Sequence, residues 1–360
     1  MFRVRAKNLG GDFQPHWQGM LSDYVTAIAW SPSGQILAAS SAAGEVTMLI
    51  VGASQTTLQA ATGQSADCLS FSHDGQFLAV GGQNGQVKIW RIQSELPELI
   101  ATVGNSRDWV DRMAWSPKRN QLAFSLGRYV QVWDSATTDI ATTLNFDTSS
   151  VLDIGWHPDG NRLTIGGYQG IKIWTADDWD DDPYLLMLDS ASVAVAWSPD
   201  GKYIASGNLD RTITVLEWEN PHPWVMRGFP GKVRQLAWSN CFTKTSAPLL
   251  ASASAESIVI WEKQADELVG WEGRVLEHHE EVVRSIQFQP DTLLFASAAA
   301  DGCICLWNKA KQLTQILEGA PNGFSCLSWH SQGQSLAAGG QNGELIIWTK
   351  ERRGQGFGSR

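Results

Sequence analysis

One short pattern returns along the whole chain and constrains its fold more than any other feature. A run of alternating apolar residues ends in an aromatic side chain, a small polar residue and a turn follow, and a second alternating run comes next. The aromatic residue recurs at intervals of 41, 44, 41, 41, 41, 50 and 41 residues, at Trp30, Phe71, Trp115, Trp156, Trp197, Trp238, Phe288 and Trp329. Self-similarity at a period of about 40 residues is typical of repeat proteins. We therefore divide the chain into eight repeated units.

Each unit has the features of a small antiparallel sheet. The alternation at period two, the turn residues Gly, Asn and Asp, and the many β-branched and aromatic residues favour strands, and no segment keeps a helical period. A unit of this length has room for four short strands, but such a sheet cannot bury both faces alone, so the units must pack around an axis. The sequence predicts an all-β protein, an eight-bladed β-propeller of four-stranded antiparallel blades. A seven-bladed ring is the alternative if one unit is degenerate or lies outside the ring.

The large number of tryptophans agrees with this architecture. Of 18 Trp residues, six close a first run and six close a later run of the same unit, where we expect them to fill the space between blades. The other six lie outside both positions, at Trp17, Trp109, Trp179, Trp218, Trp224 and Trp271.

Charge and composition exclude several classes of protein. The formal net charge is -10, whereas a protein that binds the phosphate backbone needs clustered Lys and Arg, so we expect no nucleic-acid partner. No apolar run approaches the ~20 residues that span a bilayer, and the first residues lack the apolar segment of a secretory signal, so we expect no membrane partner. The five cysteines are scattered and odd in number, which suits a reducing compartment. These features predict a cytoplasmic protein.

The seventh unit makes the chain resemble the WD-repeat family of β-propellers. Its sequence LEHHEEVVRSIQFQPDTLLFASAAADGCICLWNK carries His279, Ser297, Asp301 and Trp307 at the spacing of that family. Such residues form a hydrogen-bonded network within a blade of the family, so the resemblance implies a structural role for them. The resemblance covers residues 12–350. The repeats are degenerate and resemble those of prokaryotic members of the family. Among the third-strand tryptophans, only Trp133 is followed by Asp.

The two ends of the chain are expected to meet. We predict a single propeller domain over residues 1–360 in which the eighth unit stops after its third strand, at Trp348. Residues 12–21 would then supply the missing outer strand and remove an exposed edge. The polar, Gly-rich tail at 349–360 is predicted to be flexible.

Candidate binding residues gather at the rim of the central channel. In the family's geometry, the residue beside the Val that opens each first strand faces the rim, and by resemblance these residues are Thr26, Asp67, Asp111, Leu152, Ala194, Arg234, Arg284 and Ser325. Carboxylates on one side of the ring would oppose guanidinium groups on the other, which would orient a two-ended ligand. We predict a partner-binding site made of Asp67, Trp109, Asp111, Lys232, Arg234 and Arg284. The alternative is that these are ordinary solvated rim residues.

The acidic run TADDWDDDPYLL is a second candidate, with Asp178, Trp179 and Asp180 at its centre. The run lacks the residue spacing of a calcium loop, so a solvated loop is favoured. An exposed indole flanked by carboxylates would serve there as a docking element.

Motifs for catalysis or metal binding are missing from the sequence. It contains no phosphate-binding glycine loop, no HExxH, no GxSxG and no paired CxxC motifs. Cys303 and Cys305 alternate on one predicted strand, where packing is favoured over metal ligation because no other ligand is near in sequence. Cys68 and Cys326 share a position with Ala27, which we interpret as a slot for small core side chains.

We therefore expect no cofactor, no metal and no enzymatic activity. The sequence predicts a scaffold that binds proteins or peptides through the faces of the propeller. The alternative is a propeller enzyme, or a binder of small ligands or metals, that uses the central channel.

Overall fold

The structure is a computed structural model that describes residues 5–8, 11–52, 55–92, 97–105, 107–147, 149–220 and 222–351, with no side chains described at 5–8. The described residues form 33 strands. They include no helix that is long and apolar enough to cross a bilayer. The last strand reaches Lys350. Most of the tail predicted at 349–360 lies outside the described residues.

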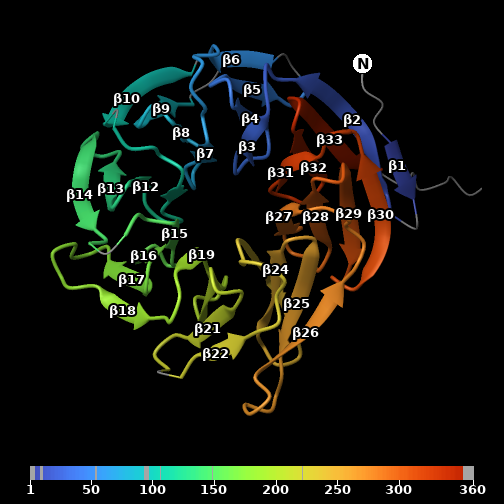
Figure 1. The fold of residues 1–360 in the computed structure, drawn as a ribbon. Coiled ribbons are helices and arrows are strands. Elements are labelled where there is room, and N and C mark those ends of the chain that lie inside the picture. The colour runs from blue at the N-terminus through green and yellow to red at the C-terminus, as the bar shows by residue number, and fades with distance from the viewer. Residues whose placement is uncertain are drawn as a thin grey trace, which may run out of the picture.

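The strands form eight sheets that stand around a central axis as the blades of a propeller (Figure 1). The innermost strand of each blade contacts the innermost strand of the next blade, from blade one around to blade eight and back to blade one. The prediction of an eight-bladed, all-β propeller is therefore confirmed.

Blades one to four follow the chain from the innermost to the outermost strand. They are β3 (Val25–Trp30), β4 (Ile36–Ser41), β5 (Val46–Ile50) and β6 (Gln55–Gln59); β7 (Cys68–Phe71), β8 (Phe77–Gly81), β9 (Gln86–Arg91) and β10 (Glu98–Gly104); β11 (Met113–Trp115), β12 (Gln121–Leu126), β13 (Tyr129–Asp134) and β14 (Asp139–Asn145); and β15 (Asp153–Trp156), β16 (Arg162–Gly167), β17 (Gly170–Thr175) and β18 (Tyr184–Met187).

Blades five to eight continue the ring. They are β19 (Ser192–Trp197), β20 (Tyr203–Asn208), β21 (Ile213–Glu217) and β22 (Trp224–Met226); β23 (Gln235–Phe242), β24 (Pro248–Ser254), β25 (Ser257–Lys263) and β26 (Trp271–Leu276); β27 (Val283–Phe288), β28 (Phe295–Ala299), β29 (Cys303–Asn308) and β30 (Gln312–Glu318); and β31 (Phe324–Trp329), β32 (Ser335–Gly340) and β33 (Glu344–Lys350).

The N-terminal part of the chain pairs with the last two blades. Strand β2 (Phe13–Met20) lies antiparallel to β33 and is the outer strand of blade eight. Strand β1 (Arg5–Asn8) lies antiparallel to β30 and adds a fifth strand to blade seven (Figure 1). The ring is thus joined by main-chain hydrogen bonds between segments that are far apart in sequence, and β33 has a partner on both sides.

Tight turns follow several of the first strands and are built in the same way. The amide of Gly75 donates to the carbonyl of Ser72, and the amide of Gly201 donates to the carbonyl of Ser198, both at 2.9 Å. Both glycines have φ near +70°, at +72° and +70°, a conformation that favours glycine over residues with a side chain. This turn sends the chain directly from the first strand into the second.

The hydrophobic core is divided into eight clusters, one at each interface between neighbouring blades. The second strands supply much of it; Leu37, Leu78 and Leu163, for example, are almost completely buried. Because each blade buries both faces against its neighbours, no blade has a core of its own.

The tryptophans that end the first strands also link the blades by hydrogen bonds. Each of the six donates its indole N–H to the preceding blade. The acceptors are the carbonyl oxygens of Ser328 for Trp30 (3.2 Å), Ser70 for Trp115 (3.0 Å), Ala114 for Trp156 (2.9 Å), Ala196 for Trp238 (3.0 Å) and Gln287 for Trp329 (3.3 Å), and the hydroxyl of Thr164 for Trp197 (2.7 Å). We call these the inter-blade indole bonds.

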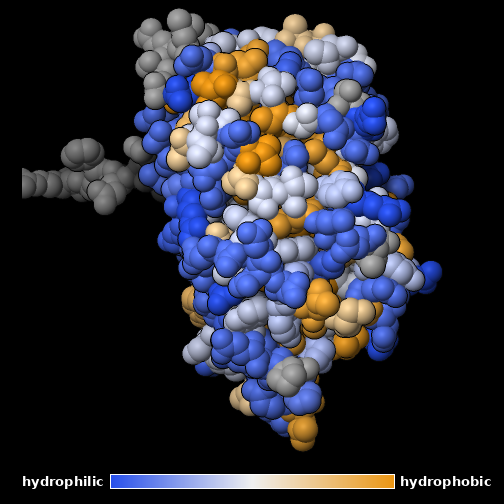
Figure 2. Space-filling model, turned by 90° about the vertical axis from the view of Figure 1, so that its left-hand side faces the viewer, coloured by the Kyte–Doolittle hydropathy of each residue, from blue (hydrophilic) through white to orange (hydrophobic). Residues whose placement is uncertain are grey.

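The outer wall of the ring is mixed in character. Figure 2 shows one side of it, where blue hydrophilic residues dominate and orange hydrophobic residues lie scattered between them. Exposed apolar side chains of the outer strands include Leu99, Leu185 and Met187. Apolar residues that are scattered in this way are ordinary on a protein surface.

Candidate functional site

The first strands of all blades begin on one face of the ring, and we call this end of the central channel the channel mouth. Its rim positions lie four residues before the aromatic residue that ends each first strand. In blade five this residue is Val193 rather than Ala194, which is buried. The register shifts between Ser192 and Ala194, as it does between Val25 and Ala27 in blade one, so Val193 corresponds to Thr26.

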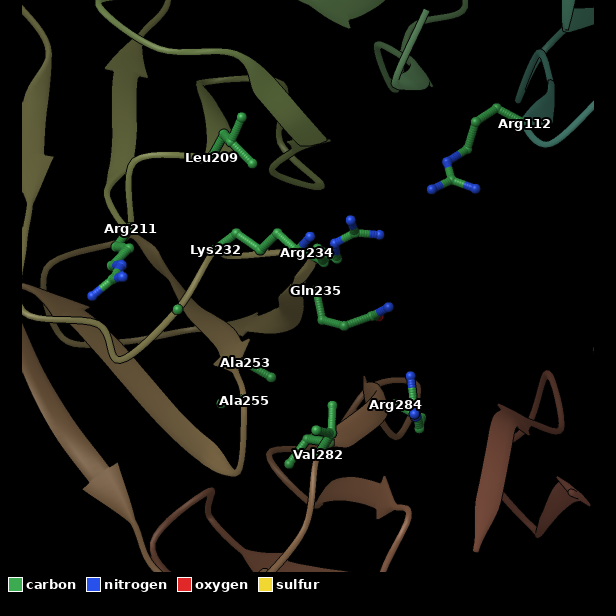
Figure 3. Close-up of a pocket in the computed structure, with 12 residues that line it drawn as sticks. Arg112, Leu209, Arg211, Lys232, Arg234, Gln235, Ala253, Ala255, Val282 and Arg284 are labelled. Atoms are coloured by element: carbon green, nitrogen blue, oxygen red, sulfur yellow. The ribbon is translucent and has the colours of Figure 1, made fainter.

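One sector of the channel mouth is a basic pocket. It has a volume of about 740 Å³ and extends over blades five to seven, with one residue from blade three on its far side. Figure 3 shows that Lys232, Arg234 and Arg284 point into the open space of the channel and that Arg112 points into it from across the ring. The structure thus brings together three of the predicted binding residues and adds two cations, Arg112 and Arg211.

The sequence prediction does not include Arg112, because Arg112 occupies the position of Ala27, Cys68 and Cys326, which the sequence pattern indicates as a slot for small side chains. Asp153 and Gln235 hold the same position in blades four and six, so the position is not restricted to small side chains, although Cys68 and Cys326 do pack against the hydrophobic core. The thiol of Cys68 does contact the neighbouring blade, where it donates to the carbonyl of Val110 at 3.2 Å. A comparison of this position across all eight units would have revealed the charged residues.

Arg112 and Asp153 form an ion pair that links three blades. The guanidinium Nε lies 3.3 Å from Oδ1 of Asp153 and donates to the carbonyl of Leu152 at 3.1 Å. The other carboxylate oxygen of Asp153 accepts the amide N–H of Val195 in blade five at 2.8 Å. Burial raises the pKa of Asp153, and the neighbouring Arg112 opposes part of that rise.

The acidic residues of the predicted site lie on the other side of the mouth. Asp67 and Asp111 are the rim residues of blades two and three, and they do not line the basic pocket. Burial raises the pKa of Asp67, and the nearby carboxylate of Asp111 raises it further, whereas a hydrogen bond from Ser65 lowers it. The opposite charges predicted at the channel mouth are therefore present in separate sectors.

Trp109 stands beside this acidic sector. It precedes the buried Val110 and is 60% exposed, which makes it the only exposed tryptophan of the 18, all of which lie in the described residues. The other five outside the repeated positions are buried or half-buried. An exposed indole at a channel mouth is an uncommon use of a large apolar side chain.

Two other rim residues use their hydroxyl groups within the protein. Thr26 donates to the carbonyl of Ala66 in blade two, and Ser325 donates to the carbonyl of Val25 in blade one at 2.6 Å. These side chains join neighbouring blades rather than pointing free groups at a ligand.

The acidic loop lies between β17 and β18, on the face opposite the channel mouth, because the first and third strands of a blade end on the same side. Asp178 and Asp180 are exposed, but the prediction of an exposed Trp179 was wrong. Its indole is half-buried and meets Trp156 edge to face, with ring centroids 6.1 Å apart. Arg119 from blade three also forms an ion pair with Asp177, so contacts fasten this loop to the body of the ring.

The four residues of the seventh unit form a continuous chain of hydrogen bonds. The indole N–H of Trp307 donates to Ser297 Oγ at 3.0 Å, and Ser297 Oγ lies 2.8 Å from His279 Nε2. His279 Nδ1 lies 2.8 Å from Asp301 Oδ2. A carboxylate only accepts, so the imidazole donates to Asp301 through Nδ1 and accepts the hydroxyl proton of Ser297 at Nε2.

Asp301 at the end of this chain is held in its charged form. Burial alone would raise its pKa, but the hydrogen bond from His279 and those from the amides of Cys303 and Glu280 outweigh burial and lower the pKa. None of these four side chains lines the basic pocket.

A metal ion needs several ligand side chains that lie close together. The part of the chain that the structure describes contains no cluster of three or more His, Cys, Asp or Glu side chains of that kind. Burial raises the pKa of the Cys305 thiol, and that residue is fully buried in the core between blades six and seven.

Comparison with known proteins supports the repeat pattern. The family model described as "WD domain, G-beta repeat" matches residues 11–47, 52–91, 139–175, 188–216, 270–308 and 311–349, which together make up more than half of the chain. Two relatives carry the name "Probable cytosolic iron-sulfur protein assembly protein 1". The protein from Kluyveromyces lactis is 26% identical over 21% of this chain, and the one from Vanderwaltozyma polyspora is 24% identical over 30%. The chain spans only 26% and 39% of the length of these relatives.

Proposed function

Because this chain belongs to the WD domain, G-beta repeat family, we propose that it is a non-enzymatic scaffold that binds a protein or peptide at the channel mouth. One observation carries the proposal. The mouth combines an acidic sector, a basic sector and the one exposed tryptophan of the chain, and all of them stand at or next to the beginnings of strands.

The surrounding structure favours binding without large rearrangement. The inter-blade indole bonds and the Arg112–Asp153 ion pair link neighbouring first strands, so the strands that carry the rim residues are held in fixed relative positions. A preorganised surface loses less conformational entropy when a partner binds. The two charged sectors would orient a partner that carries both signs of charge.

The names of the two relatives agree with an adaptor role. They are called assembly proteins, and a protein that brings components together needs binding surfaces rather than catalytic groups. The short matched segments support no proposal about iron-sulfur cargo for this chain. We also propose a cytoplasmic location, which the word "cytosolic" in those names supports.

Affinity capture with matched variants tests the proposal. The wild-type protein, Trp109→Ala at the channel mouth and Trp179→Ala on the opposite face would each be immobilised and exposed to an extract of the source cell, and captured proteins would be identified by mass spectrometry. We expect a protein that is captured by the wild type and by Trp179→Ala but is depleted with Trp109→Ala. Thermal melting of each variant shows whether it is folded.

The outcomes separate the site from the function. A partner that is lost with Trp179→Ala and kept with Trp109→Ala would move the binding surface to the acidic-loop face. If the folded wild type captures nothing beyond what a heat-denatured sample captures, the scaffold function itself is refuted.

A further inference from the structure

The basic pocket has an unusual charge for this protein. The whole chain carries a formal net charge of -10, yet the side chains that line the pocket include five cations and no carboxylate, with Arg112, Arg211, Lys232, Arg234 and Arg284 as the cations. Acidic residues do occur beside these positions in the sequence, at Asp210, Glu256 and Glu281, but they are absent from the lining.

Most of these cations have no internal partner. Within the described ranges, the side chains of Arg211, Lys232, Arg234 and Arg284 make no ion pair or hydrogen bond, whereas Arg112 is paired with Asp153. All four unpaired residues are exposed. Like charges that converge on one space repel each other, and the repulsion is relieved when anions occupy that space.

The cations come from separate elements that converge at the mouth. Arg211 lies in the turn between β20 and β21, Lys232 and Arg234 precede β23, and Arg284 lies near the start of β27. In Figure 3 the groups of Lys232, Arg234 and Arg284 reach toward the channel, and Arg211 lies farther out. A ligand with several negative groups spaced along its length can contact more than one of them, and guanidinium groups bind carboxylate and phosphate in a bidentate manner.

Apolar and small residues complete the wall of the pocket. Leu209 is 52% exposed and Val282 is 39% exposed, and the small residues Gly231, Ala253 and Ala255 also line the pocket. This mixture suits a chain whose backbone and aliphatic stems lie on small residues while its acidic ends reach the guanidinium groups. It does not suit an isolated inorganic ion, which needs no apolar wall.

We propose that the basic pocket binds a multiply anionic peptide segment of the partner, in which carboxylate or phosphoryl groups lie among Lys232, Arg234 and Arg284. This inference rests on the proposed function and specifies the chemistry of the segment that is bound. Four of the five cations lie in blades five to seven, while Asp67 and Asp111 stand on the other side of the mouth beside Arg112, so an extended polyanion such as nucleic acid meets carboxylates outside the pocket. A short acidic segment fits within the positive sector.

Fluorescence polarisation with short labelled peptides tests the inference. The probes are a peptide rich in Glu, the same peptide with phosphoserines in place of Glu, the same with Gln and the same with Lys. We expect the Glu and phosphoserine peptides to bind the full-length wild type roughly tenfold or more tightly than the Gln peptide, and the Lys peptide not to bind in the pocket. Comparison of the first two probes shows which source of negative charge is preferred.

Matched charge reversals locate the binding. Arg234→Glu/Arg284→Glu should weaken binding of both acidic peptides by roughly tenfold or more and make the residual binding less sensitive to salt. The control Lys118→Glu/Lys244→Glu makes the same change of formal charge at exposed turn residues on the opposite face and should bind like the wild type. The neutral pair Arg234→Gln/Arg284→Gln should show an intermediate loss, and thermal melting checks that each variant is folded.

Several results would overturn the inference. Equal losses of affinity in Arg234→Glu/Arg284→Glu and in the control would mean that only the total charge matters. Unlabelled oligothymidylate that competes with the acidic peptides and binds more tightly than they do would point to nucleic acid as the ligand. Preference for the Gln or Lys peptide over both acidic peptides would overturn the anionic specificity and leave the scaffold function standing. If none of the probes binds, the inference is refuted, and the capture experiment decides separately whether the scaffold function also fails.

Discussion

The chain of hydrogen bonds in blade seven predicts a large loss of stability for His279→Ala. The imidazole is the middle link, because it accepts from Ser297 and donates to Asp301. Its side chain is 1% exposed. Removing the imidazole breaks both hydrogen bonds and leaves a cavity that the smaller alanine side chain fills only in part.

The size of the loss follows from the partners that remain. A hydrogen bond to a charged group such as Asp301 contributes about 1.5–3 kcal/mol. Ser297 is completely buried, so its hydroxyl proton would lose its acceptor at a cost of about 1–3 kcal/mol. Asp301 offsets part of this loss because it keeps the amide donors of Glu280 and Cys303. We expect a net decrease in the free energy of unfolding of about 3 kcal/mol.

Guanidinium chloride unfolding followed by tryptophan fluorescence measures the effect. Ser252→Ala in blade six is a matched control, since Ser252 accepts the indole N–H of Trp261 at 3.0 Å but has no imidazole partner. We expect that control to lose about 1 kcal/mol and both variants to keep the denaturant dependence of the wild type.

The pH dependence gives a second test. A lowered pKa means that Asp301 contributes stability that is fully present above its ordinary value of 3.8 and is lost as the pH falls through the lower folded value. The deficit of His279→Ala should therefore be largest near neutral pH and shrink in acid. Equal losses for His279→Ala and Ser252→Ala, or a deficit that stays constant into acid, would refute this account of the network.

Three further predictions concern the ring itself. Deleting residues 1–22 removes β1 and β2 and exposes an edge of β33, so we expect aggregation or a large drop in melting temperature, and a monomer with unchanged melting would contradict this. Ala338 occupies the position in blade eight that Ser297 occupies in blade seven, two residues beyond the strand partner of the third-strand tryptophan. Ala338→Ser should therefore give the unpaired indole N–H of Trp348 an acceptor and raise the free energy of unfolding by about 1 kcal/mol in denaturant titration. A loss of stability would mean that the hydroxyl does not fit. Trp179→Ala removes the contact with Trp156 and should lower the free energy of unfolding by about 1 kcal/mol or more in the same titration. Peptide binding at the channel mouth should stay unchanged. Stability equal to that of the wild type would show that the indole does not contribute to packing.

The blade number and the all-β class could be predicted because each repeat carries its own strand and turn signals. The tryptophans at Trp30 and Trp115 were correctly placed between blades, but their hydrogen bonds could not be predicted. Periodicity tells which residue type stands at a position, whereas the acceptor is a backbone atom of another unit. The rim residue of blade five, in contrast, could be predicted from sequence spacing, because Val193 stands four residues before Trp197 just as Thr26 stands four residues before Trp30.

The candidate site was predicted only in part, for reasons of side-chain length and contact. Arg234 and Arg284 follow from position alone, whereas Arg112 reaches the same pocket from across the ring because its side chain is long. Trp179 was expected at the surface because five aspartates surround it, yet its partner Trp156 lies at the end of the first strand of the same blade. Contacts of this kind depend on the path of a loop, which local sequence does not specify.

The inter-blade indole bonds have a consequence for how a repeat protein of this kind can evolve. In five of the six bonds the donor is a side chain and the acceptor is a main-chain carbonyl, which every residue possesses. A blade that carries the tryptophan can therefore be placed after almost any other blade, and the accepting blade is free to vary its own side chains. Duplication of a unit would add a blade whose link to its neighbour is already complete. At the two junctions where the first strand ends in Phe71 or Phe288 this bond is missing, and there the link between blades rests on apolar packing.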